Sequence, residues 1–131
     1  MRLEEAIKAI HAPKGVTSMI AGAMSGDFDP IREQNAVGQS LESARQKLAD
    51  VQKAQQNCGS DWAYWGYQGD ISYWSAVVNI LEAAAISGPE NLPDMPPLDE
   101  SPAVVMDMCA RVEKYGRTLL EKAKAAKAPT L

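Results

Sequence analysis

The first ten residues follow the hydrophobic period of an α-helix. Four apolar residues stand at positions i, i+3, i+4 and i+7: Leu3, Ala6, Ile7 and Ile10. This spacing places their side chains on one helical face, and Pro13 with Gly15 is expected to end the helix. The apolar positions of residues 17–24 predict a second short helix.

The segment from Asp29 to Asn57 has the pattern of a long amphipathic helix. Asp29 suits an N-cap and Pro30 suits the first helical position, so a helix is predicted over about 30–57. Its apolar residues are spaced alternately by four and three: Val37, Leu41, Ala44, Leu48 and Val51. So narrow a seam indicates packing against one neighbouring helix. That neighbour is either the next helix, which gives a hairpin, or a second copy of the chain, which gives a homodimer.

A turn at residues 58–60 is expected to separate this helix from the next. Gly59 suits a helix end, and Ser60 suits the cap of the following helix. The helical period then continues over residues 61–87 and ends before Gly88.

Two glycines and an aspartate interrupt the beginning of that second long helix. Gly66 and Gly69 each cost about 1 kcal/mol relative to Ala in a helix interior. We therefore expect a kink at one of them, or a fresh helix start capped by Asp70.

Five of the eight prolines fall between residues 88 and 102. They predict an extended surface connection over 88–101, anchored by three apolar residues: Leu92, Met95 and Leu98. Ser101 and Pro102 then suit the start of a last helix. The fold predicted for 1–131 is a single all-α domain, a small bundle with three principal helices at about 30–57, 61–87 and 102–127 and one or two short N-terminal helices.

Composition narrows the possible functions. The cysteines, Cys58 and Cys109, are far apart in the sequence and form no CxxC or Cys/His group, so we expect free thiols and no metal site. No apolar run has the length of a signal peptide or a membrane span, so the expected location is the cytoplasm. No motif for a nucleotide or another cofactor is present.

The charge of the chain is distributed unevenly. Residues 54–110 contain eight acidic residues and no Lys or Arg, whereas the rest of the chain has a net charge of +4. Proteins that stack nucleic-acid bases on aromatic rings place cations beside those rings. Direct nucleic-acid binding and membrane binding are therefore not expected, and the acidic stretch suits a basic partner surface.

Six of the eight aromatic residues lie within that acidic stretch: Trp62, Tyr64, Trp65, Tyr67, Tyr73 and Trp74. Three interpretations are open. Part of the group can fill the core, as expected for Trp62, Trp65, Tyr73 and Trp74. The outward rings can form a protein-docking patch, as expected for Tyr64, Trp65 and Tyr67. The rings can also form a pocket for a planar or cationic small molecule.

Residues suited to catalysis are few. His11 is the only histidine, and its position at the end of the first helix favours a capping role. Asp61 and Asp70 flank the aromatic residues, where a carboxylate shielded from water can have a raised pKa. Both also stand where helix N-caps are expected, and that role accounts for them without catalysis. We therefore predict that the protein is not an enzyme.

No motif identifies a family. In size, acidity and helical content the chain resembles small accessory proteins of bacteria and their phages, including inhibitors of host defence systems. That resemblance implies a protein that covers the basic surface of a partner. We expect Tyr64, Trp65 and Tyr67 to be the anchors, with Asp61 and Asp70 steering association.

The alternative function is binding or sequestration of a small molecule or nucleotide in an aromatic pocket. Such a site needs cations that fold over the rings. Three cations of the last helix are the candidates: Arg111, Lys114 and Arg117.

Overall fold

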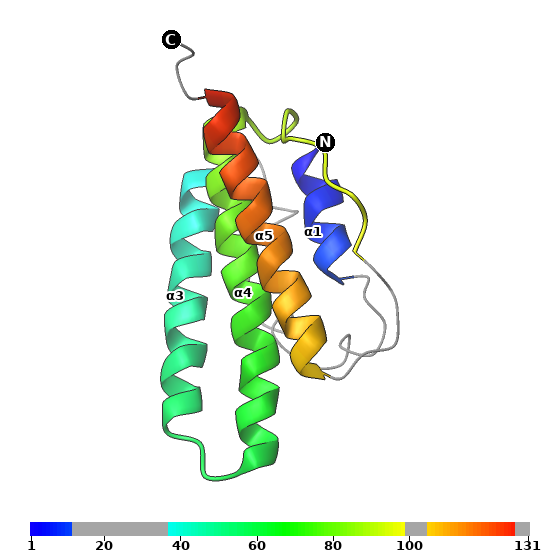
Figure 1. Cartoon of the computed structure of the whole chain (residues 1–131). Helices are drawn as coiled ribbons and strands as arrows, with labels where there is room; N and C mark the ends of the chain where they lie inside the picture. The colour runs from blue at the N-terminus through cyan, green and yellow to red at the C-terminus, as the bar shows by residue number, and fades with distance from the viewer. Residues whose placement is uncertain (12–36, 99–104, 128–131) are drawn as a thin grey trace.

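The computed structural model describes residues 1–11, 37–98 and 105–127, and these form helices without strands (Figure 1). The helices are α1 (Leu3–His11), α3 (Val37–Gln56), α4 (Asp61–Ser87) and α5 (Val105–Lys127). The all-α class is thereby confirmed. The short helix predicted over 17–24 and the helix starts predicted at Pro30 and Pro102 lie outside the described residues.

Helix α4 is the centre of the structure, because α3, α5 and α1 each pack against it (Figure 1). Its buried positions therefore surround the helix. They are Gly69, Ile71, Ser72, Tyr73, Trp74, Ala76, Val77, Val78, Ile80, Leu81, Ala83 and Ala84. A helix that is apolar on nearly all sides is one that other elements cover.

Helix α4 is continuous over Asp61–Ser87, so the fresh helix start expected at Asp70 is wrong. Packing from several neighbours stabilises the helix by more than its two glycines cost. Its ends follow the prediction. Ser60 is the N-cap, and its Oγ accepts a hydrogen bond from the Ala63 N–H at 3.1 Å. Gly88, at φ 90°, ends the helix with its N–H donating to the Ala84 carbonyl.

Helices α3 and α4 form the hairpin that was one alternative for the narrow seam. Within the seam, Ala44 is fully buried, and three further residues pack against the core: Leu41, Leu48 and Val51. The side chain of Val37 lies outside the described residues. At the polar edge of the interface, Arg45 Nη2 lies 3.0 Å from Glu82 Oε1.

Helix α1 docks through its predicted face, since Leu3, Ala6, Ile7 and Ile10 are all fully buried. Two backbone hydrogen bonds tie its start to the proline-rich connection. The Leu3 N–H donates to the Pro89 carbonyl at 2.6 Å, and the Leu92 N–H donates to the Met1 carbonyl at 2.8 Å. Leu92 is buried, and Met95 and Leu98 pack against the core, so these apolar residues do anchor the connection.

The backbones of α4 and α5 approach closely at Gly116. A Cβ at that position would lie 2.7 Å from Ala76 Cα and 3.0 Å from its carbonyl oxygen. Backbone atoms cannot move aside as the end of a long side chain can. Position 116 therefore requires glycine, although glycine is intrinsically unfavourable within a helix.

We predict that Gly116→Ala lowers the free energy of unfolding by about 1–3 kcal/mol, because the added methyl group forces the two helices apart. Gly66→Ala is the matched control. Apart from the neighbouring residues and the backbone of its own helix, no atom of the described residues lies within 4 Å of a Cβ placed there, so this change should stabilise the helix by about 0.5–1 kcal/mol. Urea unfolding followed by circular dichroism measures both values, and equal effects of the two variants would contradict the close packing.

Candidate functional site

The structure divides the described aromatic residues between the core and the surface. Tyr73 and Trp74 are buried, and their rings meet edge to face with centroids 5.2 Å apart. Tyr64 and Trp65 form a second edge-to-face pair at 5.4 Å. The pairs are nine residues apart on one helix, about 13 Å along its axis. The rings thus form two pairs rather than one cluster, and Tyr73 and Trp74 serve the core.

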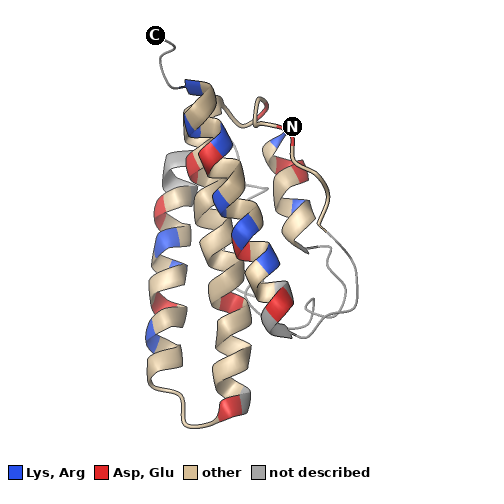
Figure 2. Cartoon of the chain, in the orientation of Figure 1, with Lys and Arg blue, Asp and Glu red and all other residues tan. Residues whose placement is uncertain are grey.

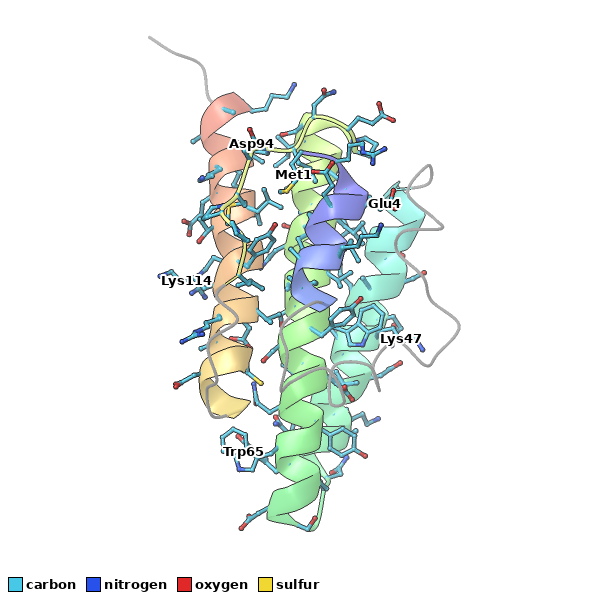
Figure 3. The ribbon with its side chains drawn as sticks, turned by 90° about the vertical axis from the view of Figure 1, so that its right-hand side faces the viewer. Met1, Glu4, Lys47, Trp65, Asp94 and Lys114 are labelled. Carbon is cyan, nitrogen blue, oxygen red and sulfur yellow. The ribbon has the colours of Figure 1, made fainter. Side chains whose placement is uncertain are left out.

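The surface pair belongs to a region that we call the hairpin tip, residues 55–68 at the turn between α3 and α4. Tyr64 is 43% exposed and is the large apolar residue that stands out to solvent among those described. Trp65 is half-buried and lies beside the first turns of α5 (Figure 3). Tyr67 is also half-buried, and the side chain of Trp62 lies outside the described residues.

Two surface hollows adjoin Tyr64. One has a volume of about 440 Å³. It is lined by Gln55, Gln56, Cys58, Gly59, Ser60, Asp61 and Tyr64. The other has a volume of about 240 Å³ and lies between α4 and α5. It is lined by Tyr64, Trp65, Gln68, Cys109, Ala110 and Glu113. Tyr64 therefore lines both hollows, which can receive side chains of another molecule.

Acidic groups surround this end of the molecule. Asp61 and Asp107 are exposed in the first turns of α4 and α5. Glu113 accepts a hydrogen bond from Ser72 Oγ at 2.8 Å. Figure 2 shows acidic residues at the lower ends of α4 and α5, whereas the basic residues of α5 begin above its first turns. The last turn of α3 contributes Lys53 as its one cation.

Hydrogen bonds hold the hairpin tip in place. Gln55 Nε2 donates to Gln68 Oε1 at 3.0 Å and to the Tyr64 carbonyl at 3.3 Å. The Ser60 cap fixes the first turn of α4. Tyr64 therefore rests on a backbone that is secured from both helices of the hairpin.

The described surroundings of the two cysteines do not indicate an activated thiol. Both are free, and Cys58 Sγ lies 3.8 Å from the Ser60 carbonyl oxygen. Burial raises the pKa of the Cys109 thiol, a hydrogen bond with Ser72 partly offsets this, and the Glu113 carboxylate raises it further. A raised pKa keeps the thiol protonated, and the thiolate is the nucleophilic form. His11 ends α1, but its side chain lies outside the described residues.

Asp70 is not an N-cap, because it lies in the interior of α4, and the cap expected at Asp61 is provided by Ser60. Within the described part of the chain, Asp70 Oδ1 is buried without a hydrogen-bond partner. Burial raises the pKa of this carboxyl from 3.8 to about 6. The raised pKa that the sequence suggested for this position thus arises from loss of water around a single carboxylate.

The three candidate cations of α5 do not share one place. Arg111 and Lys114 line a groove against the proline-rich connection. Arg117 is exposed and does not line that groove. The hollow beside Tyr64 and Trp65 is lined by none of the three. Sequence reasoning did not find this groove, because its other wall, residues 95–98, was considered only as a connection.

No protein family, curated protein or solved structure matches the chain at a significant level. In the residues that the structure describes, no three potential metal ligands gather. None of the four described helices is both long and apolar enough to cross a membrane.

The buried carboxylate of Asp70 predicts how the stability of the protein depends on pH. Well below pH 3.8, Asp70 is protonated in both the folded and the unfolded chain, so burying it does not bury a charge. As the pH rises towards 6, the unfolded chain releases this proton first, so the parent protein loses stability relative to Asp70→Asn. Because the side chain is partly exposed, we expect Asp70→Asn to be more stable by about 1–2 kcal/mol at pH 7.

Urea unfolding of parent and variant between pH 4 and pH 7 measures this difference. The exposed Asp50→Asn on α3 controls for the loss of one negative charge. A difference between parent and Asp70→Asn that stays constant over this range would contradict the assignment.

Proposed function

We propose that this protein is a non-catalytic interaction protein whose hairpin tip docks on the basic surface of a protein partner. Tyr64 carries the proposal, because an exposed aromatic residue that lines two hollows has the form of an interface anchor. Its polar hydroxyl and large ring suit a surface that is solvated when free and buried when bound. Trp65 extends the apolar area towards α5.

The charges around the anchor favour a basic partner. Asp61 and Asp107 are exposed, and Glu113 lines the hollow beside Trp65. Negative charge at the rim of an interface speeds association with a positive surface and disfavours acidic partners. Direct binding to nucleic acid is disfavoured for the same reason, because phosphate would meet carboxylates.

The fixed backbone of the hairpin tip also favours docking. Binding costs less when the anchor is already ordered, because less conformational entropy is lost. The contacts of Gln55 and the Ser60 cap provide that order. Covering a basic surface in this way is how an inhibitor or accessory protein can act without chemistry.

Site-specific photo-cross-linking tests the proposal. We expect a benzophenone amino acid in place of Tyr64 to form adducts with a partner protein in a lysate of the native host. The same probe at Glu121, exposed far along α5, is the matched control and should form none. Equal adducts from both positions would argue against the hairpin tip as the interface.

Affinity measurements with the purified partner then separate the two contributions. Tyr64→Ala should weaken binding by about tenfold or more, since truncating an anchor costs at least about 1–2 kcal/mol. Asp107→Asn should instead slow association and reduce its dependence on salt. Circular dichroism confirms that each variant is folded. Unchanged affinity in folded Tyr64→Ala would refute the proposed anchor.

A further inference from the structure

A groove lies between α5 and the proline-rich connection, away from the hairpin tip, with a volume of about 360 Å³. It is lined by Met95, Pro96, Pro97, Leu98, Arg111, Lys114, Tyr115, Thr118 and Lys122. This volume is within the range of small-molecule sites, which are about 300–1,000 Å³. At roughly 30 Å³ for each water-sized group, it accommodates a ligand of about a dozen heavy atoms.

The apolar wall of the groove is held by contacts from both ends of the connection. Met1 and Leu92 pair through their backbones, with the Met1 ammonium donating to the Leu92 carbonyl at 2.6 Å. Lys122 Nζ donates to the Asp94 carbonyl at 3.1 Å, which joins the connection to α5. Met95 and Leu98, which follow Asp94 in the connection, pack against the core. The groove is thus a formed feature of the fold.

The charged groups that line the groove are all cations. Three of its residues are basic and none is acidic. Lys114 is exposed on the outer side of α5 (Figure 3). It makes no hydrogen bond or ion pair with any other described residue. Lys122 uses one of its three donors on the Asp94 carbonyl.

We propose that this groove binds a small amphipathic carboxylate, with its apolar body against residues 95–98 and its carboxylate beside Lys114. Two features together favour this ligand. The proline and methionine side chains offer apolar surface but few hydrogen-bonding groups, which disfavours a polar ligand body. Cations on the rim favour an anionic head and disfavour a neutral one. The site is independent of the function proposed for the hairpin tip.

Calorimetric titration with three probes tests both features. Sodium octanoate should bind in the groove about five- to tenfold more tightly than octanamide, which has the same chain and no charge. Sodium acetate, which lacks the apolar chain, should show no saturable binding. In amide NMR spectra, octanoate should shift residues 95–98 and 114–118 and leave the hairpin tip unchanged. Octanoate and octanamide binding alike, or shifts confined to other residues, would overturn the proposal.

Variants of α5 test which cation interacts with the carboxylate of octanoate. Lys114→Met should weaken octanoate binding by about three- to fivefold and leave octanamide binding unchanged. Arg117→Met removes an exposed cation from the same helix outside the groove, and it should bind octanoate as the parent does. An equal loss in both variants would show a general charge effect and overturn the site.

Sedimentation velocity addresses the other possible occupant, a second copy of the chain. We expect the parent and Lys114→Met to sediment alike. A parent dimer that Lys114→Met converts to a monomer would show that another copy fills the groove, and it would also overturn the proposal.

Discussion

Gly116 brings the backbone of α5 against Ala76 of α4, and this contact sets the distance at which the two longest described helices pack. Because no side chain separates the two backbones at this point, side chains of α4 and α5 on either side of it can contact each other. Ser72 donates a hydrogen bond to Glu113 towards the hairpin tip, and Trp65 and Cys109 line the same hollow. Towards the other end, the same placement of α5 puts Tyr115 and Lys122 opposite the connection. Both candidate surfaces therefore depend on one backbone contact.

The central position of α4 explains why short elements are ordered around it. Helix α1 has nine residues, fewer than an isolated helix needs to be stable in water. Its apolar face is fully buried, and the Leu3 N–H donates a hydrogen bond to the carbonyl of Pro89, just after α4 ends. The connection is ordered in turn, because the Leu92 N–H donates a hydrogen bond to the Met1 carbonyl. Helix α1 and the connection thus stabilise each other, and the groove wall depends on that pairing.

Local patterns predicted the features that depend on neighbouring residues in the chain. The face of α1, the Ser60 cap and the Gly88 helix end all follow from short-range spacing or cap chemistry. Asp70 was misassigned because its N-cap role rested on a helix break that tertiary packing removes. The groove was missed because its walls come from segments distant in sequence. The need for Gly116 likewise arises from Ala76, which is distant in sequence and lies opposite it in the fold.

In the fold, the uneven charge distribution of the sequence becomes a change of charge along α5. The stretch without cations ends at Ala110, one residue before the first cation of α5. Helix α5 therefore changes from acidic to basic along its length, with Asp107 near the hairpin tip and Lys114 and Lys122 at the groove. The acidic end of α5 attracts a basic molecule and repels an anion, whereas its basic end attracts an anion and repels a basic molecule. The two proposed sites, for an anion in the groove and for a basic partner at the hairpin tip, are therefore electrostatically compatible.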